Sequence, residues 1–226
     1  MTQSHIGSAI LRTVDDLRGP AGKLEALLNA GKPDAPCAAL VCHPHPLGGG
    51  TMHNKVVYHA MKAFQSFGLP VLRFNFRGTE LSDGKHDYGQ GEQDDVRAAL
   101  DWLDREYHLP ILFAGFSFGS YVGLRACCGD ARVIGLVALG IPAHAEGRDY
   151  DYRFLAHCPQ PKLFVSGTRD QFGAVDAVEK VVALAQEPKQ LVWISEADHF
   201  FASKLEDVRQ AIRVWAQHCF PLLATQ

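Results

Sequence analysis

The chain has 226 residues and a formal net charge of −3, and 47% of its residues are hydrophobic and 21% charged, which is typical of a globular α/β protein of this length. The balance of charge excludes the basic surface of a nucleic-acid-binding domain, and no stretch approaches the ~20 continuous apolar residues of a membrane span. The first residues lack the basic and apolar segments of a secretory signal. We therefore expect a single domain over residues 1–226, cytoplasmic, with no nucleic-acid partner and no membrane span.

Apolar and amphipathic segments alternate along the first half of the chain. Residues 9–14 and 23–28 alternate loosely between apolar and polar side chains, and Gly19-Pro20 lies between them, so we expect an edge hairpin. Residues 37–42 form a nearly continuous apolar run, which predicts a strand buried on both faces. The next predicted elements are a helix at 56–67 that ends at Gly68, a strand at 71–76 and a helix at 92–107.

The same alternation continues to the end of the chain. The predicted strands are 110–114, 133–141, 162–166 and 190–195, and the predicted helices are 120–126, 175–185 and 205–219. This order predicts a mostly parallel sheet with helices on both faces. Right-handed crossovers then place the carboxyl ends of the strands, and the functional loops, at one edge. The only long irregular connection, 142–161, is too short for a large cap domain.

Residues 115–119 read Gly-Phe-Ser-Phe-Gly and lie between a predicted strand and a predicted helix. Strand, G-x-S-x-G and helix in this order are typical of a nucleophile elbow, a sharp turn that exposes the serine hydroxyl. The glycines suit a turn whose backbone is crowded on both sides, because they have no Cβ. Ser117 is therefore the candidate nucleophile.

A serine hydroxyl needs a base within hydrogen-bond reach, and the base needs an acid that holds its tautomer. Of the histidines downstream, His199 directly follows a predicted strand, whereas His218 is near the end of the last helix. His144 and His157 fall in the irregular connection and could line the site. Asp170 follows the strand at 162–166, so we expect Ser117, His199 and Asp170 to meet. The other candidate acid, Asp176, is expected to cap a helix.

An oxyanion hole needs two backbone N–H donors, one of which is expected from Phe118, directly after the serine. The other is expected from the loop that begins His43-Pro44-His45-Pro46-Leu47. Because proline has no N–H, His45 and Leu47 are the nearest donors, and His45 is preferred. For substrate binding we expect apolar contacts from four residues, although each aromatic could equally belong to the core: Leu47, Phe116, Phe172 and Phe200.

Two alternative readings of this loop are weaker. His43, His45 and His53 match no standard metal-ligand spacing, so we expect no metal, no cofactor and imidazoles that bond to the loop backbone. Cys42 ends a buried run, where an inert thiol is the default. All six cysteines lack a C-x-x-C pairing, and reduced thiols are expected.

Taken together, six segments resemble the small bacterial α/β-hydrolases, most closely the cap-less group related to dienelactone hydrolases. They are CHPHP (42–46), GGTMHNKVV (49–57), RFNFRG (73–78), GEQDD (91–95), GFSFG (115–119) and DHFF (198–201). The resemblance covers nearly the whole chain and implies an α/β-hydrolase fold with an eight-stranded sheet and a triad of Ser117, Asp170 and His199. Two features depart from the group: serine replaces the cysteine nucleophile of true dienelactone hydrolases, and residues 79–82 read Thr-Glu-Leu-Ser.

These observations favour a serine carboxylesterase that acts on small, short-acyl esters through an acyl-enzyme. A thioesterase, amidase or acyl transferase on the same residues is the alternative within enzymes. A non-catalytic binding protein on a hydrolase scaffold is the alternative from another class. The sequence leaves the natural substrate and the oligomeric state open.

Overall fold

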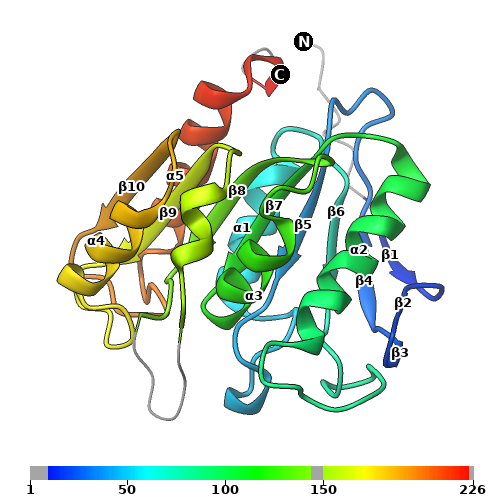
Figure 1. Cartoon of the computed structure of the whole chain (residues 1–226). Coiled ribbons are helices and arrows are strands. Elements are labelled where there is room, and N and C mark those ends of the chain that lie inside the picture. The colour runs from blue at the N-terminus through cyan, green and yellow to red at the C-terminus, as the bar shows by residue number, and fades with distance from the viewer. Residues whose placement is uncertain (1–9, 144–149, 224–226) are drawn as a thin grey trace.

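Eight strands form one sheet in the computed structural model, which describes residues 10–143 and 150–223 (Figure 1). In spatial order they are β1 (Leu11–Val14), β4 (Ala26–Asn29), β6 (Val71–Phe74), β5 (Ala38–Cys42), β7 (Ile111–Phe116), β8 (Val133–Leu139), β9 (Lys162–Gly167) and β10 (Lys189–Ile194). The pairs β1–β4 and β4–β6 are antiparallel, and all the others are parallel. The predicted eight-stranded, mostly parallel sheet is therefore confirmed.

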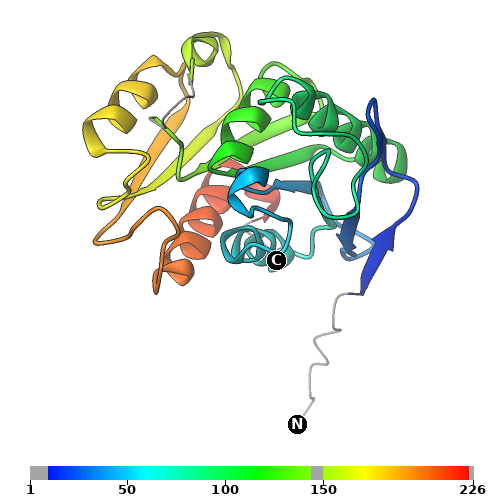
Figure 2. The ribbon, with the colours of Figure 1, turned by 90° about the horizontal axis from the view of Figure 1, so that it is seen from below.

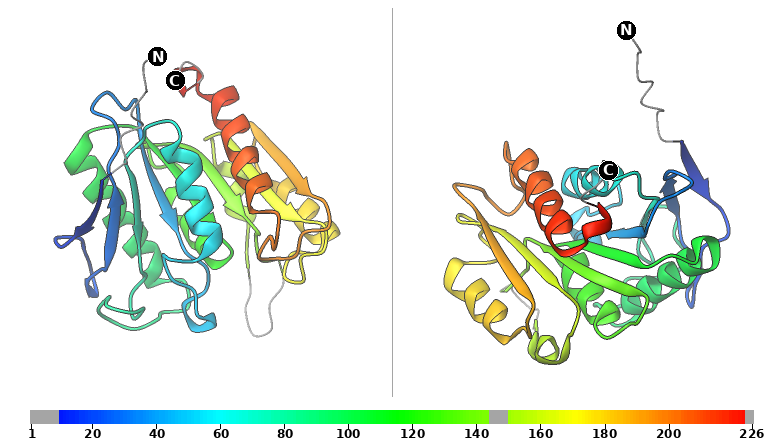
Figure 3. Two further views of the ribbon diagram at one scale, coloured as in Figure 1. Left: turned by 180° about the vertical axis from the view of Figure 1, so that it is seen from behind. Right: turned by 90° about the horizontal axis from the view of Figure 1, so that it is seen from above.

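Helices cover both faces of the sheet. Helices α2 (Gly91–Tyr107), α3 (Phe118–Cys127) and α4 (Val175–Leu184) lie on one face, and α1 (Lys55–Gln65) and α5 (Leu205–Cys219) lie on the other (Figures 1 and 3). Each layer has its own buried apolar cluster. The helix predicted at 205–219 is present as α5 and buries Val208, Ile212 and Trp215 against the sheet. The sheet core is thus closed on both sides, as expected for an α/β fold.

The predicted edge hairpin is present but interrupted. Strands β1 and β4 pair with Val14 opposite Ala26, and a small ribbon of β2 (Arg18–Gly19) and β3 (Gly22–Lys23) lies between them. The second strand therefore begins at Ala26 and not at residue 23, because Lys23 pairs within the ribbon and its N–H donates to Asp83 Oδ2 at 2.7 Å. Residue 9, which the prediction included, is outside the described residues.

The loops that follow the parallel strands emerge at one edge of the sheet, at the bottom of Figure 1, and Figure 2 views this edge directly. Strand β6 ends two residues earlier than predicted, because the Phe76 N–H leaves the sheet and donates to the His43 ring. In its described part, the connection between β8 and β9 contains only the short 3-10 helix η2 (Arg153–His157). No large cap covers the edge in the described residues.

No helix among residues 10–143 and 150–223 combines the length and the apolar character that crossing a bilayer requires.

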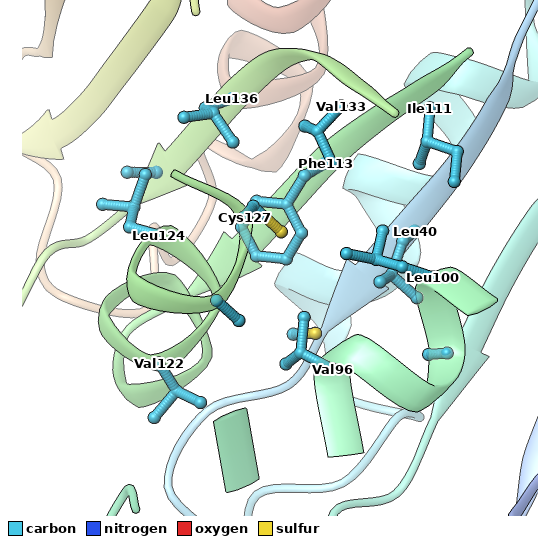
Figure 4. Packing of buried hydrophobic residues seen from close by; sticks show 14 of the residues in the cluster. Leu40, Val96, Leu100, Ile111, Phe113, Val122, Leu124, Cys127, Val133 and Leu136 are labelled. Atoms are coloured by element: carbon cyan, nitrogen blue, oxygen red, sulfur yellow. The ribbon is translucent and has the colours of Figure 1, made fainter. Parts of the chain in front are cut away.

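Helix α3 packs very closely on the sheet at Gly123. Figure 4 shows the Phe113 side chain of β7 between this helix and the side chains of Leu40 and Leu100. A Cβ atom placed on Gly123 would lie 1.9 Å from Phe113 Cζ. Glycine therefore lets the helix approach the aromatic ring, and this approach sets the depth of the helix that begins directly after Ser117.

We expect Gly123→Ala to destabilise the fold by about 1–3 kcal/mol, because overpacking forces the ring or the helix to shift. Helix propensity alone predicts the opposite, a gain of about 1 kcal/mol. Urea denaturation decides between the two effects. The control is Gly48→Ala, since Gly48 is exposed with no atom within 4 Å of an added Cβ, and its change should stay within about 0.5 kcal/mol. Unchanged or increased stability of Gly123→Ala would contradict the packing argument.

Candidate active site

Ser117 occupies a strained turn between β7 and α3. Its backbone angles are φ 54° and ψ −120°, a region that residues with a Cβ rarely adopt and that costs about 1–3 kcal/mol. The turn is held by its neighbours: Ser117 N–H donates to Leu139 O at 2.9 Å, and Ser120 N–H donates to Ser117 O at 2.9 Å. Surrounding contacts thus maintain a conformation that the serine alone would not keep.

The two glycines of the G-x-S-x-G motif are required by close backbone packing. A Cβ on Gly115 would lie 2.4 Å from Gly119 O, and a Cβ on Gly119 would lie 2.3 Å from His43 O. Both distances are far below any real carbon–oxygen contact. The elbow is therefore wedged against the end of β5, and the loop after β5 lies directly beside the serine.

The structure brings Ser117, His199 and Asp170 into one chain of hydrogen bonds. His199 Nε2 lies 2.9 Å from Ser117 Oγ, and His199 Nδ1 lies 2.8 Å from Asp170 Oδ2 and 3.0 Å from Oδ1. Because a carboxylate only accepts, Nδ1 carries the proton and Nε2 accepts from the serine hydroxyl. The His199 and Asp170 side chains are buried, whereas Ser117 is half-buried.

Each residue comes from the carboxyl end of a different strand: Ser117 from β7, Asp170 from β9 and His199 from β10. The Asp170 carboxylate also accepts two backbone hydrogen bonds through Oδ1, from Phe172 N–H at 2.8 Å and from Gly173 N–H at 3.0 Å. These bonds orient the carboxylate toward the imidazole before any substrate is present.

The other candidate acids lie elsewhere. Asp176 is exposed in the first turn of α4 and pairs with Lys180. It is not the helix cap that the sequence predicted, because Ala174 holds that position. Asp198 accepts from Ala202 N–H, and Glu196 pairs with Arg169. In the described part of the chain, Asp170 is the one carboxylate hydrogen-bonded to His199.

The remaining histidines do not join this chain of hydrogen bonds. His157 and His218 are exposed, and His144 lies outside the described residues. In the loop after β5, His43 is buried and bonds to backbone on both sides, to Pro44 O through Nδ1 at 2.7 Å and to Phe76 N–H through Nε2 at 3.0 Å. The structural role expected for the His43 imidazole is thus present. Among the described residues no cluster of three or more His, Cys, Asp and Glu side chains is placed to hold a metal ion.

The candidate oxyanion donors lie in helix α3 and in the loop after β5. Phe118 is the first residue of α3, so its N–H has no acceptor within the helix. Leu47 N–H donates to His45 Nδ1 at 3.1 Å in the short helix η1 (Pro46–Gly48). The Leu47 donor is therefore engaged within its own loop.

The predicted apolar contacts divide into two groups. Phe172 and Phe200 lie edge-on to the His199 ring, at centroid distances of 4.7 and 5.3 Å, and both are partly exposed. Leu47 is exposed on η1. Phe116 is fully buried and packs against the imidazole at 5.1 Å. Phe116 thus supports His199 from the core, in contrast to the substrate contact expected from the sequence.

A buried ion pair near the site has no counterpart in the sequence prediction. Arg77, in the loop after β6, donates through Nη2 to Asp95 Oδ1 at 2.7 Å and through its backbone N–H to Oδ2 at 3.0 Å. Burial raises the pKa of the Asp95 carboxyl despite these bonds. The sequence did contain a signal for this pair, because Asp95 lies beside the buried residues Val96 and Ala99 on the apolar face of α2.

Glu92 forms hydrogen bonds with the later part of the loop after β6. Its carboxylate is fully buried and accepts from Asp87 N–H at 2.7 Å and Gly89 N–H at 2.8 Å, while His86 Nδ1 lies 2.8 Å from Oε1. The His86 ring in turn contacts the rings of Phe118 and His45. Glu92 therefore lies against an imidazole that contacts the side chains of both residues carrying the candidate oxyanion donors.

The Cys42 thiol and the His43 imidazole, at the end of β5, remain uncharged near neutral pH. Burial raises the pKa of the Cys42 thiol well above its ordinary value, so the expected inert character of Cys42 agrees with its surroundings. Burial lowers the pKa of His43 from 6.5 to about 3. The neutral His43 ring can accept the Phe76 N–H, which a protonated ring could not.

We expect the free energy of unfolding to fall below pH 6.5 because of His43. Below pH 6.5 the His43 ring binds a proton in the unfolded chain but stays neutral in the folded protein. The stability that the neutral His43 ring contributes is therefore complete above pH 6.5 and is lost as the pH falls toward 3. Between pH 8 and 5 the loss is about 2 kcal/mol. Urea denaturation across this range should show a shallower dependence for His43→Gln. Parallel curves for the two proteins would contradict the assignment.

Comparisons with known proteins identify the family of the fold. The family model described as alpha/beta hydrolase domain matches residues 38–220. An uncharacterized protein of Rickettsia prowazekii is 39% identical over 202 residues, which cover 86% of this chain and 84% of that protein.

Solved structures with the same fold include serine hydrolases. A serine hydrolase without a lid from Xanthomonas campestris is 34% identical, with a TM-score of 0.80 over 93% of this chain and 94% of the other. An alpha-beta serine hydrolase homologue from Coxiella burnetii is 33% identical, with a TM-score of 0.81 over 93% and 99%. The match of the family model over most of the chain, with relatives above 30% identity, shows that the protein belongs to the alpha/beta hydrolase family.

Proposed function

We propose that this protein is a serine carboxylesterase that cleaves small esters with short acyl groups. The observation that carries the proposal is the continuous chain of hydrogen bonds from Ser117 Oγ through His199 to Asp170. A nucleophile, a base and an orienting acid in this order are what acyl transfer requires. The likeness to a lidless serine hydrolase supports the same reaction class.

In the proposed reaction Ser117 Oγ attacks the ester carbonyl while His199 Nε2 takes its proton. His199 then returns the proton to the leaving alcohol, and an acyl-enzyme remains on Ser117. Water, activated by the same imidazole, attacks the acyl group and releases the acid. Asp170 holds Nδ1–H and stabilises the imidazolium that forms in each step.

The oxyanion is assigned to the backbone N–H groups of Phe118 and His45. The N-terminus of α3 carries a partial positive charge that favours an anion beside Ser117. The wedge between Gly119 and His43 O brings the loop after β5 next to this helix end. Losing one such donor typically costs about 3–4 kcal/mol of transition-state stabilisation.

The side chains around His199 support a small apolar acyl group. The Phe172 and Phe200 rings both contact the imidazole and are partly exposed, and Leu47 is exposed on η1. Ester cleavage needs less assistance to the leaving group than amide cleavage, because an alcohol leaves more readily than an amine. We therefore favour an ester over an amide as the substrate of this open site.

We expect Ser117→Ala to lower the hydrolysis of p-nitrophenyl acetate and butyrate by about 10⁴- to 10⁶-fold, because the nucleophile is removed. The matched control is Ser195→Ala, at an exposed serine after β10, which should retain full activity. A fluorophosphonate should label the wild type once, at Ser117, and should not label Ser117→Ala.

Other outcomes of this assay identify the alternatives. Cleavage of thioesters or amides in preference to esters would replace the esterase by a thioesterase or an amidase. Labelling of Ser117 without turnover of any ester, thioester or amide would favour a binding protein on the hydrolase scaffold. Full activity in Ser117→Ala would end the proposal.

Asp170→Asn should lower kcat by about 10²- to 10⁴-fold, because an amide no longer fixes the Nδ1–H tautomer of His199. Asp176→Asn removes the alternative candidate acid, which is exposed and pairs with Lys180. Its activity should be unchanged. Steady-state kinetics on the same ester measure both variants, and equal losses in the two would contradict the assignment of the acid.

A further inference from the structure

Two thiols and a buried lysine meet at the end of the sheet opposite to Ser117. Cys128 is the residue at which α3 ends, Cys158 ends η2, and Lys162 begins β9. A helix of 10 residues spans about 15 Å, so this group is remote from the candidate active site. Neither the thiols nor the lysine has a part in the proposed hydrolysis.

Hydrogen bonds hold the two cysteine-bearing segments together. Gln160 Nε2 donates to Cys127 O at 3.1 Å and to Asp130 O at 3.2 Å, and Gly129 N–H donates to Gln160 Oε1 at 3.1 Å. These bonds join the end of α3 to the segment that carries Cys158. The Cys128 thiol donates to Phe154 O in η2 at 3.9 Å, and the Cys158 thiol donates to Gln160 Oε1 at 3.4 Å. The same Gln160 oxygen accepts from the N–H of Gly129, the residue after Cys128, so the two thiols lie on adjoining segments.

The Lys162 ammonium is buried without a carboxylate partner in the described residues. Its Nζ donates to Cys158 O and Gln160 O, both at 2.6 Å, and the lysine is only 1% exposed. The Glu187 carboxylate acts on the charge of Lys162 from a distance, but its ion-pair partner is Lys189, whose Nζ lies 3.7 Å from it. A buried cation is costly without an anion, and the charges that act on the Lys162 ammonium include those of the Cys158 and Cys128 thiols when they ionise.

The two thiols differ in pKa and in exposure, as expected for an attacking cysteine and a resolving cysteine. The neighbouring Cys158 thiol lowers the pKa of Cys128 to about 7, and the Lys162 ammonium acts in the same direction against the effect of burial. The proximity of Cys128, together with burial, raises the pKa of Cys158. Cys128 is half-buried and reachable, whereas Cys158 is fully buried. The adjacent Cys127 points into the core around Phe113 (Figure 4).

We propose that Cys128 and Cys158 form a redox site that reduces a hydroperoxide and is itself oxidised to a disulfide. The Cys128 thiolate attacks the terminal peroxide oxygen; an S–O bond forms, the O–O bond breaks, and the alkoxide or hydroxide leaves and takes up a proton. Cys128 is then a sulfenic acid. The Cys158 sulfur attacks the Cys128 sulfur; the S–S bond forms and the S–O bond breaks. The hydroxide leaves with the Cys158 proton as water.

In sum, two thiols and one hydroperoxide give a disulfide, an alcohol or water, and one further water. The two electrons pass from the sulfur atoms to the peroxide oxygens. Low thiol pKa, access and a resolving cysteine nearby are the features of peroxide-sensitive sites. A small dithiol reductant would return both residues to thiols.

The experiment exposes the reduced full-length protein to one equivalent of hydrogen peroxide at pH 7, blocks remaining thiols with N-ethylmaleimide, and measures the intact mass. We expect two fewer maleimide adducts and a cross-link between the tryptic peptides 126–132 and 154–162. Because peptide 126–132 contains both Cys127 and Cys128, Cys127→Ser is the matched control and should form the same bond. Cys128→Ser should form none.

Cys158→Ser separates the two steps. In this variant we expect a sulfenic acid at Cys128 that dimedone traps, because the resolving thiol is missing. Cys219 serves as an internal reference, since burial raises its pKa, and Cys128 should react with iodoacetamide at least about threefold faster at pH 7. Equal rates at the two cysteines would overturn the proposal. So would a persistent sulfenic acid in the wild type, or a disulfide cross-link between peptides 126–132 and 154–162 in Cys128→Ser.

Phenylarsine oxide, which bridges two neighbouring thiols, tests their proximity without oxidation. One bridged adduct is expected in the wild type and in Cys127→Ser, and none in Cys128→Ser or Cys158→Ser. A wild-type protein that binds no arsenical would show that the thiols cannot meet, which would also overturn the proposal.

Discussion

The close approach of backbone to backbone at the elbow is the constraint on which the site depends. Gly115, Gly119 and the carbonyl of His43 leave no room for a Cβ atom between β7, α3 and the end of β5. This packing keeps Ser117 at φ 54° and sets the loop after β5 beside the helix N-terminus. The strain at one residue is thus balanced by contacts among three elements, as expected for functional turns.

Buried polar contacts extend this rigidity to the loops around the serine. The neutral His43 ring ties the loop after β5 to the Phe76 N–H, and Arg77 and Asp95 tie the loop after β6 to α2. Farther along that loop, the backbone N–H groups of Asp87 and Gly89 donate to the Glu92 carboxylate. Loops at the rim of a sheet are usually its most mobile part, and these bonds keep the rim in one arrangement.

Helix α3 links two different kinds of chemistry. Its first turn faces Ser117, while its end carries Cys128 against Cys158 and the buried Lys162 ammonium. Both sites rely on the depth at which the helix packs, which Gly123 and Phe113 determine. In the two proposals, the same helix therefore positions the serine hydroxyl at one end and the cysteine thiol at the other.

Local patterns in the sequence were sufficient for the parallel sheet, for its helices and for the nomination of Ser117, Asp170 and His199. Each signal is short: a glycine-flanked serine between a strand and a helix, or a polar residue just after an apolar run. The β2–β3 ribbon escaped prediction, because two-residue strands depend on cross-chain contacts such as that of Lys23 N–H with Asp83. The catalytic roles of the three residues stay a prediction.

The sequence by itself determined the order of elements and the edge at which the functional loops emerge, because hydrophobic periodicity and chain handedness act locally. Only the tertiary structure decided which neighbours each side chain meets. It placed Phe116 beneath the His199 ring, joined Arg77 to Asp95, and brought Cys128 to Cys158 beside Lys162. These contacts join residues distant along the chain, and their energies depend on burial, which no local pattern encodes.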